Sequence, residues 1–503
     1  MRSRCWSRMG MAELRRFRCD VCGYVHEGPE PPEICPVCGV GREMFSPVEV
    51  PQASIESPAA GGTRWVCTVC GYEHAGDAPP ELCPVCAVDA ELFVLQPPTT
   101  ESSAIQLTSE RIVIVGAGGA GLTAAEYARK QSSARISLIN KEPVRPYNRL
   151  SLTRFLNREV VEAELFLKTE SWYAEQSIEI ISGEVTRIDR SQHLIELGDG
   201  TTQRYDRLVL ANGAHPFVPP IVGVQREGVL PLRTLAQAQR ILQVVKPGTE
   251  VVVIGGGLLG LEAAAALNSH GARVTVVEGH GWLLPRQLAQ SAGELLTAHL
   301  EGIGVAIARQ AVVAEIYGDE TVHGVRLQDR TELPARLVIL AAGVRPNKYL
   351  PLQAGLETHR GVIVDDAMRT SDPDVFACGD VAEHRGVVYG LWTTALGQGA
   401  VAGANAAGGA SSFGGTPPAN QLKVLDLPVF SIGQFNPVDG GYVVLEHCEG
   451  GHLRRFVCHD GAIAGANLVG DLHLAGPIKR AIELGTQLSE LPAELRALPE
   501  FRE

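Results

Sequence analysis

The sequence lacks a long apolar run and a surplus of basic residues. No stretch of about 18 consecutive apolar residues occurs in the 503-residue chain. The formal net charge is −13, whereas a face that binds nucleic acid needs clustered lysine and arginine. The Arg-rich start, with Met1 and Met11 as alternative first residues, lacks the apolar core of a secretory signal. We therefore expect a cytoplasmic protein with neither a membrane nor a nucleic acid as partner.

Cysteine is also absent from long parts of the chain, and most of it is concentrated near the start. Eight of the twelve cysteines form two groups with the spacing Cys-x-x-Cys, twelve residues, Cys-x-x-Cys. In a reducing compartment this pattern indicates a metal site rather than disulfides. Four thiolates suit Zn²⁺ or a single iron, and spacing alone does not choose between them. The predicted ligands are Cys19, Cys22, Cys35 and Cys38, then Cys67, Cys70, Cys83 and Cys86.

A strand, a glycine turn and a helix are predicted directly after the second cysteine group. The glycines follow an apolar strand at residues 112–115 and open a helix, which is the context in which such a turn binds a dinucleotide pyrophosphate. The next strand ends at Asn140, with Glu142 two residues on. We expect Glu142, helped by Asn140, to accept hydrogen bonds from the ribose hydroxyls. The three glycines are Gly116, Gly118 and Gly121.

The same pattern returns at residues 250–280. The strand after the second glycine turn ends in Glu278, and a carboxylate there accepts from both ribose hydroxyls while repelling the extra phosphate of NADP. NADH is therefore favoured. NADPH stays open as the alternative because His280 and Arg286 lie nearby. The three glycines of this turn are Gly255, Gly257 and Gly260.

Further motifs resemble the flavoproteins of the pyridine nucleotide oxidoreductase family, which bind two dinucleotides. The stretch "VFACGDVAEHRG" contains Gly379 and Asp380, which in that family bind the ribityl chain of the flavin. The stretches "LVLANGAHP" and "LVILAAGVRPN" are similar to its two crossover motifs. The resemblance implies FAD in the first fold and a nicotinamide dinucleotide in the second. It adds as cofactor contacts Ala211, Gly213 and Gly343.

The stretch "PYNRLSLTRFL" resembles more narrowly the branch that contains rubredoxin reductases and the flavin part of nitrite reductases. This resemblance makes Arg149 a cofactor contact and places Arg154 where a lysine is usual. Glu262 matches a residue kept near the flavin and is the one candidate for a catalytic residue. Disulfide reductases of the family carry a cysteine pair early in the FAD domain, but no cysteine occurs between Gly121 and Glu250. Electrons therefore cannot pass to a dithiol there.

The two cysteine groups resemble the short rubredoxin domain found at the end of rubrerythrins. Each carries Gly-Tyr after its second cysteine, Pro-Val between its last two, and an aromatic residue before the first and after the last. The resemblance implies one iron in each group. The second group has Ala87 where the first has Gly39, which weakens the second site if φ is positive there. Zinc-bound modules that recruit a partner are the alternative.

Taken together, these patterns predict an NAD(P)H-dependent FAD oxidoreductase of the rubredoxin reductase type. Electrons would pass from NADH through FAD to two fused Fe(Cys)₄ centres and on to an external redox protein. The resemblance suggests as acceptor a rubrerythrin-like protein, a flavo-diiron protein or a hydroxylase. The alternative is an NADH oxidase, or a nitrite-reductase-type flavoprotein whose cysteine modules bind zinc and serve for docking.

The predicted fold class is α/β, with two Rossmann-like dinucleotide-binding domains for FAD and NAD. A C-terminal α+β domain follows them, and two small rubredoxin-like metal modules precede them. The glycine-rich residues 395–409 suit a helix packed closely inside the protein. The predicted parts are modules at 14–48 and 64–95, linkers at 49–63 and 96–108, an FAD domain at 109–216 and 335–412, an NAD domain at 217–334, and a C-terminal domain at 413–503.

Overall fold

The structure is a computed structural model of the whole chain. It divides into two compact units, Met1–Ser103 and Ala104–Glu503. In the second unit the structure describes residues 110–415, 419–424, 427–437 and 440–501. In the first unit it describes residues 15–19, 25–28, 30–33, 41–42, 45–48, 64–67, 73–76, 78–79 and 93–96.

Each cysteine group contributes a three-stranded antiparallel sheet, and the two sheets share one topology. Their strand orders are β2-β1-β3 and β5-β4-β6. The registers also correspond, because Cys19 lies opposite Phe45 and Cys67 lies opposite Phe93. The repeated sequence therefore yields a repeated fold. The strands are β1 Arg15–Cys19, β2 Val25–Gly28, β3 Phe45–Val48, β4 Arg64–Cys67, β5 Glu73–Ala75 and β6 Phe93–Gln96.

The first half of the second unit is built on a five-stranded parallel sheet of order β25-β13-β7-β8-β9. Except for the edge strand β9, its strands are buried along most of their length, which explains why they read as largely continuous apolar runs rather than alternating ones. A three-stranded antiparallel sheet, β10-β11-β12, is attached to it. The elements are β7 Arg111–Val115, α1 Gly119–Gln131, β8 Arg135–Asn140, β9 Ile178–Ser182, β10 Val185–Asp189, β11 Leu194–Leu197, β12 Thr202–Arg204, β13 Arg207–Leu210 and β25 Val375–Ala377.

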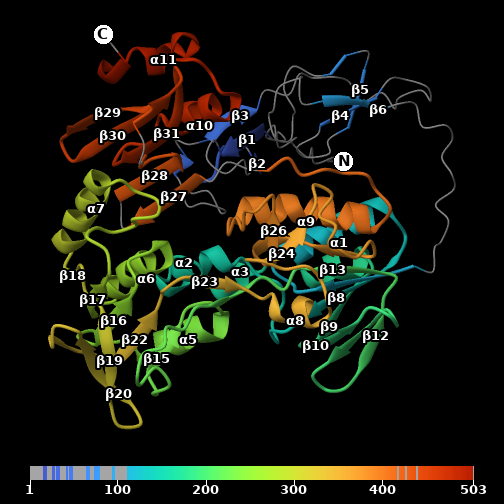
Figure 1. Ribbon diagram of the computed structural model, residues 1–503, viewed down its shortest axis with the longest axis horizontal. Helices are drawn as coiled ribbons and strands as arrows, with labels where there is room; N and C mark the ends of the chain where they lie inside the picture. The colour runs from blue at the N-terminus through green and yellow to red at the C-terminus, as the bar shows by residue number, and fades with distance from the viewer. Residues whose placement is uncertain are drawn as a thin grey trace, which may run out of the picture. The chain divides into compact units, whose positions relative to one another are not determined.

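Helix α9, Trp392–Ala406, lies directly beside helix α1 in this half (Figure 1). The approach is close because a Cβ atom on Gly399 would lie 2.3 Å from the carbonyl oxygen of Ala120. Gly403 faces Ala124 in the same way. Small residues are thus required where the two helices touch, and the expectation of a closely packed helix in the glycine-rich tract is confirmed.

The second half repeats the design with a parallel sheet of order β15-β22-β16-β17-β18 and an antiparallel sheet β19-β20-β21. Strand β22, Leu337–Leu340, pairs with β16. The boundary predicted at residue 335 is therefore wrong, because the chain leaves this sheet only after β22. The other elements are β15 Val229–Pro231, α5 Leu235–Val244, β16 Glu250–Ile254, α6 Leu258–Ser269, β17 Arg273–Val277, α7 Gln290–Gly302, β18 Ala306–Ala308, β19 Val313–Gly318, β20 Val322–Leu327 and β21 Glu332–Pro334.

The chain crosses between the halves along a two-stranded ribbon of β14, Ala214–Pro216, and β23, Val344–Pro346. Smaller elements complete this unit. They are α2 Leu152–Leu156, α3 Glu162–Leu165, α4 Glu170–Glu175, α8 Tyr349–Gln353, β24 Val362–Val364 and β26 Ala382–His384.

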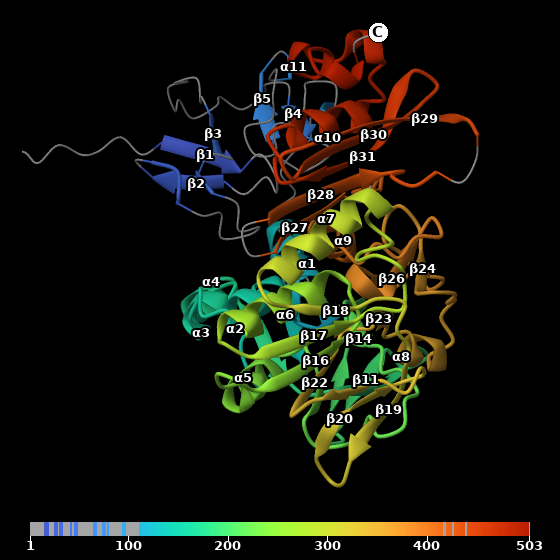
Figure 2. The same ribbon diagram turned by 90° about the vertical axis from the view of Figure 1, so that its left-hand side faces the viewer.

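The C-terminal part is an antiparallel sheet of order β27-β28-β31-β30-β29 with helices after it, as predicted. Helix α10 packs on one face of the sheet, and α7 lies against it from the second half (Figure 2). Asn467 is fully buried at this contact, where its Nδ2 donates to the Gln287 carbonyl at 3.1 Å. The elements are β27 Ala419–Val424, β28 Leu427–Gly433, β29 Tyr442–Glu449, β30 His452–His459, β31 Ala462–Val469, α10 Ala475–Leu484 and α11 Ala493–Arg496.

Candidate functional site

The first glycine turn has the geometry that a dinucleotide site requires. Gly116 has a φ of +107°, and a Cβ on it would lie 2.3 Å from the carbonyl oxygen of Ala211. A Cβ on Gly121 would lie 1.8 Å from the carbonyl oxygen of Gly116. Gly118 caps α1, and a Cβ on it would meet no atom within 4 Å. The first and third glycines thus permit close packing, and the second leaves open space before the positive end of a helix.

Three buried polar atoms near this turn have no hydrogen-bond partner among the described residues: Asn212 Oδ1, Thr394 Oγ1 and Gln398 Nε2. Asn212 follows β13 closely, and Gln398 accepts through Oε1 from the backbone N–H of Gly379 at 2.9 Å. Both positions lie at the carboxyl ends of parallel strands, where open α/β sheets bind their ligands. Because a buried polar atom without a partner is costly, the residues at this edge fit a large polar cofactor such as FAD.

Glu142 lies in a polar cluster between the two halves of the unit. Its carboxylate accepts from the hydroxyl of Tyr147 at 2.7 Å and forms an ion pair with Arg149. Burial is the main reason that the pKa of Tyr147 is raised, so Tyr147 stays a donor. The Tyr147 hydroxyl accepts from the backbone N–H of Leu235, and Arg149 donates to the carbonyl of Arg233 at 2.6 Å. Glu142 and Arg149, predicted separately as cofactor contacts, are therefore direct partners.

Asn140 ends strand β8, as predicted. Its amide nitrogen donates to the carbonyl of Val144 at 2.6 Å and closes the loop that carries Glu142. This amide group is used within the protein, so the help expected from Asn140 at the ribose stays a prediction.

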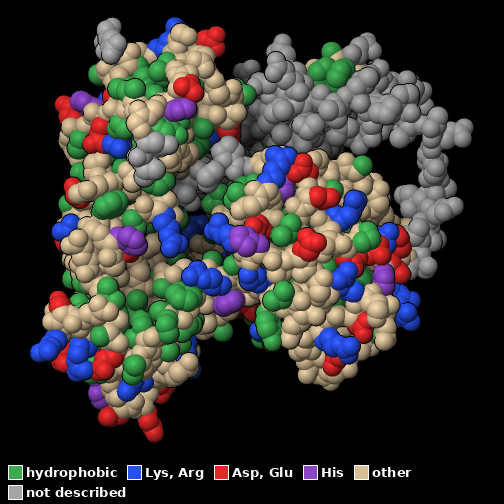
Figure 3. All heavy atoms as spheres, viewed as in Figure 1, with side chains coloured by type: hydrophobic (Ala, Val, Ile, Leu, Met, Phe, Trp, Pro, Cys, Tyr) green, Lys and Arg blue, Asp and Glu red, His purple; other side chains and the backbone are tan. Residues whose placement is uncertain are grey.

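Asp380 lies in the short turn after β25, where Gly379 has a φ of +75°. The guanidinium of Arg233 approaches Asp380 Oδ2 at 3.1 Å and links the two halves of the unit. On the face seen in Figure 3, Lys, Arg and His side chains gather along the junction of these halves. Such a junction attracts anionic ligands of the dinucleotide type.

The second glycine turn repeats the first. Gly255 has a φ of +115° and packs on Ala341, as Gly116 packs on Ala211. A Cβ on Gly260 would lie 2.1 Å from the carbonyl oxygen of Gly255, whereas a Cβ on Gly257, which caps α6, would meet no atom within 4 Å. This turn therefore offers a second dinucleotide the same open approach to a helix N-terminus.

Glu278 directly follows β17 and is buried, with 8% of its surface exposed. Its Oε2 accepts from the backbone N–H of Gly256 at 2.9 Å. Its Oε1 accepts from the backbone N–H of His280 at 2.9 Å and from the ring nitrogen Nδ1 at 2.8 Å. The carboxylate predicted to select the dinucleotide thus lies over the second glycine turn.

Glu262 on α6 faces α2, whose Leu152 and Leu156 share the hydrophobic core of the second half. The hydroxyl of Thr153 donates to Glu262 Oε2 at 2.8 Å. Burial raises the pKa of Glu262 to about 7, with a further rise from Glu159, while the hydrogen bond from Thr153 lowers it. Arg154 pairs with Glu159 at 3.2 Å rather than with Glu262. Glu262 is therefore an enclosed carboxyl between α6 and α2, and the described residues show no ion pair to it.

The crossover residues hold the ribbon between the halves. The carbonyl of Gly213 accepts from the backbone N–H of Asn347 at 2.9 Å, and that of Gly343 accepts from Phe217 at 2.8 Å. Both glycines have positive φ values. Their carbonyl groups are thus used within the ribbon, and the contacts of Ala211, Gly213 and Gly343 with a cofactor stay predictions.

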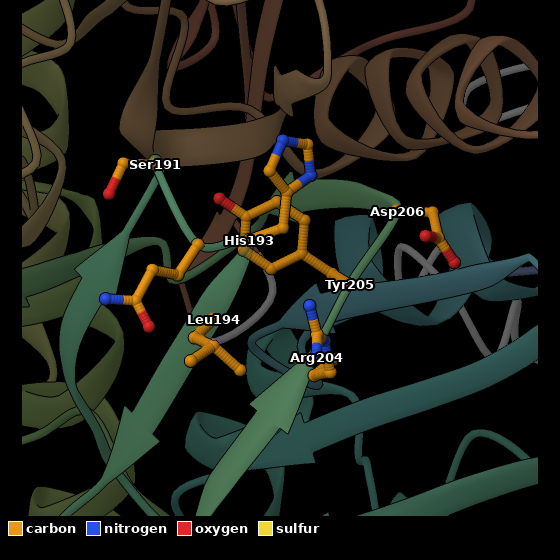
Figure 4. Close-up of a pocket in the computed structure, with 7 residues that line it drawn as sticks. Ser191, His193, Leu194, Arg204, Tyr205 and Asp206 are labelled. Carbon is orange, nitrogen blue, oxygen red and sulfur yellow. The ribbon is translucent and has the colours of Figure 1, made fainter.

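One pocket of the surface lies away from these turns. It is lined by the β10–β11 connection and by residues after β12 (Figure 4). Asp206 in this pocket accepts from the backbone N–H of Arg111, where β7 begins. The pocket is therefore at the amino ends of the parallel strands, opposite to the edge that binds dinucleotides. Its labelled lining residues are Ser191, His193, Leu194, Arg204, Tyr205 and Asp206.

The predicted metal ligands lie mostly outside the described residues. Cys19 and Cys67 are the last residues of β1 and β4. The described part of the chain contains no group of three or more candidate ligands that could hold a metal. No helix within the described ranges is long and apolar enough to cross a membrane. Outside them lie Cys22, Cys35, Cys38, Cys70, Cys83 and Cys86.

Comparison with known families decides the assignment of the fold. The family model for pyridine nucleotide-disulphide oxidoreductases matches residues 110–399, more than half of the chain. The chain belongs to this family. Two further family models match segments of this oxidoreductase on either side of residues 110–399. The rubredoxin-like domain of rubrerythrin matches residues 17–46 and 65–94, and the C-terminal domain of rubredoxin NAD+ reductase matches residues 418–486. The predicted resemblance and fold class are confirmed.

Individual relatives place the oxidoreductase near two kinds of protein. It is 34% identical over 386 residues to nitrite reductase [NAD(P)H] of Bacillus subtilis, covering 76% of this chain and 48% of the relative. It is 36% identical over 283 residues to rubredoxin-NAD(+) reductase of Pseudomonas putida, covering 56% and 74%. The crystal structure of NADH:rubredoxin oxidoreductase from Clostridium acetobutylicum superposes with a TM-score of 0.67 at 29% identity, covering 77% and 99%. The chain spans about half the length of the nitrite reductase it matches.

Several residues of the site were missed from the sequence. Thr153 and Arg233 contact predicted site residues far away in the chain, whereas Tyr147 contacts Glu142 only five residues away. Gln398 and Thr394 lie on a helix that sequence reasoning assigned to packing alone. Tyr147 and Thr153 both lie in the recognised motif that contains Arg149 and Arg154, and this position was the signal in the sequence.

Proposed function

We propose that this oxidoreductase takes electrons from NADH and delivers them, through bound FAD, to iron in its two four-cysteine modules. From there the electrons would reach an external redox protein. Bound FAD supplies the chemistry of accepting a hydride and releasing single electrons. The protein itself binds and orients the reactants, with one glycine turn for each dinucleotide and with Glu278 at the second turn.

The observation that carries the proposal is the combination of two complete dinucleotide turns with two rubredoxin-like matches in one chain. No cysteine occurs between Gly121 and Glu250, so the dithiol exit of disulfide reductases is missing. The two modules are then the groups within this chain that accept electrons from the flavin. One iron accepts one electron, and one NADH donates two, so two iron centres match a single hydride transfer.

Metal analysis and an anaerobic NADH titration of the full chain test the proposal. Iron should be bound, and its ferric absorption should bleach as NADH is added. Complete reduction should consume about two NADH per chain, because the flavin and the two irons together store four electrons. A Cys83→Ser variant should lose one iron and lower that requirement to about 1.5 NADH. Bound zinc, or ferric iron that NADH leaves unbleached, would contradict the proposal.

A second candidate function follows from the match to nitrite reductase of Bacillus subtilis over 386 residues. In this alternative, the chain is an NADH oxidase or the flavin part of a nitrite-reducing system. Its modules then bind zinc and recruit a partner. Zinc in both modules together with NADH-dependent oxygen consumption would favour this alternative.

The external acceptor is proposed by class, as a rubrerythrin-like protein, a flavo-diiron protein or a hydroxylase. Stopped-flow mixing of the NADH-reduced chain with one member of each class tests this proposal. Reoxidation of iron should be fast with the true class and slow with the others. Location in the cytoplasm stays a prediction from the sequence.

A further inference from the structure

The adenosine end of the second dinucleotide site is closed by a pair of side chains, Glu278 and His280. One of the three hydrogen bonds to the Glu278 carboxylate comes from the second glycine turn, and the other two come from His280 in the loop after β17. Gly256 donates to Oε2 at 2.9 Å. His280 donates to Oε1 twice, at 2.9 Å from its backbone N–H and at 2.8 Å from Nδ1. Both oxygens are therefore held, and the carboxylate has no second orientation that keeps these bonds.

The backbone on both sides of this pair is also fixed. The N–H of Glu278 donates to the carbonyl of Ala308 at 2.9 Å, and the Glu278 carbonyl accepts from Ala311 at 3.0 Å. The carbonyl of His280 accepts from Gln310 at 3.0 Å. The segment thus cannot shift without breaking bonds to the neighbouring strand and loop.

The ring of His280 is oriented by its bond to the carboxylate. A carboxylate only accepts, so Nδ1 of His280 carries the proton in this arrangement. The same nitrogen is then not available to a phosphate. Of the two groups that left NADPH open, His280 thus has its Nδ1 committed to Glu278, and the groups that could still meet a 2′-phosphate are its Nε2, on a side chain that is 63% exposed, and the exposed Arg286.

We propose that His280 is a positioning residue that holds the Glu278 carboxylate in place and so selects dinucleotides without a 2′-phosphate. This inference rests on the proposed function, because it assumes that the second turn binds a nicotinamide dinucleotide. A fixed carboxylate can accept from the ribose hydroxyls, and it meets a 2′-phosphate as an unavoidable like charge. Without the ring, the carboxylate keeps its two hydrogen bonds from backbone N–H groups but loses the third, from Nδ1. It is then held less firmly, which weakens the bond to the hydroxyls and relieves part of the repulsion.

Direct binding of two small probes to the full chain with bound FAD tests this role. The probes are adenosine 5′-monophosphate and the same nucleotide with an added 2′-phosphate, measured by titration calorimetry. We expect the chain to bind the unmodified nucleotide more tightly. In His280→Ala this preference should fall about fivefold, the size of one exposed ion pair. His280→Asn should restore most of the preference, since an asparagine amide can donate in place of Nδ1.

A matched control is His323→Ala, because His323 is an exposed histidine on strand β20 of the same half. It should leave the preference unchanged. Steady-state rates can be measured with ferricyanide, which accepts electrons without the modules. For His280→Ala, the preference for NADH over NADPH, measured as the ratio of the two KM values, should fall by the same factor.

The possible outcomes distinguish a failure of the proposed dinucleotide site from a failure of the proposed role of His280. If the unaltered chain binds neither nucleotide, the second turn is not a dinucleotide site and the proposed function fails with it. If it binds the unmodified nucleotide and His280→Ala keeps the same preference, the role of His280 is refuted while the proposed function stands. A stronger preference in His280→Ala would show that the ring serves a 2′-phosphate, and it would also overturn the inference.

Discussion

The enclosed carboxyl of Glu262 should make the stability of the protein depend on pH in the neutral range. Burial is the main cause that raises the pKa of Glu262 from 4.5 to about 7. The folded protein therefore holds this proton more tightly than the unfolded chain. The resulting stability is fully present below about pH 4.5 and is lost as the pH rises through about 7.

The magnitude follows from the shift between the two pKa values, 4.5 and about 7. At 1.36 kcal/mol per unit, the total loss is about 3 kcal/mol, and about 2 kcal/mol of it falls between about pH 5.5 and about pH 8. Glu262→Gln removes this loss, because glutamine is neutral at every pH and keeps an oxygen to accept from Thr153. Relative to the unaltered chain, the variant should therefore gain about 2 kcal/mol over that range.

The assay is denaturant unfolding of both proteins, with FAD bound, at several pH values. Infrared spectroscopy gives a direct readout, since the carbonyl stretch of a protonated carboxyl should titrate near pH 7 and be missing in Glu262→Gln. Thr153→Val is the matched control. It removes the hydrogen bond that lowers the pKa of Glu262, so the infrared titration of Glu262 should have its midpoint at a higher pH. If the difference in unfolding free energy between Glu262→Gln and the unaltered chain stays constant over this pH range, the reasoning is refuted.

Two further predictions concern packing. Gly399→Ala should lower the melting temperature and loosen FAD, because its Cβ would lie 2.3 Å from the carbonyl oxygen of Ala120. Gly397→Ala on the same helix makes only a 3.7 Å contact and should differ little, so equal effects of the two variants would contradict the close helix contact. Asn467→Leu should destabilise the contact between the C-terminal sheet and the second half by about 2 kcal/mol, since the Gln287 carbonyl and its neighbours lose a buried partner. Unchanged thermal unfolding of Asn467→Leu would show that this contact contributes little.

Local sequence patterns were enough to predict the domains of this protein, its two glycine turns and its two cysteine modules. Each glycine turn is specified by a short stretch of sequence, because the strand, the tight turn and the start of the helix depend on residues that are neighbours in the chain. The two cysteine groups are equally local, and their family matches at residues 17–46 and 65–94 lie within the predicted modules. The carboxylates at the strand ends, Glu142 and Glu278, follow from the same rule.

Partners distant in the sequence were decided only by the tertiary structure. Thr153 meets Glu262 because α2 packs against α6, and Arg233 meets Asp380 because the first and second halves face each other. Both pairs join residues more than 100 positions apart, so no spacing in the sequence predicts them. The boundary after β22 depends in the same way on which sheet accepts the strand. The sequence by itself determined the two dinucleotide turns and the repeated modules, since these depend on backbone geometry over short segments. The packing of the halves decided which charges are paired and which, like Glu262, are enclosed, because burial is a property of the assembled fold.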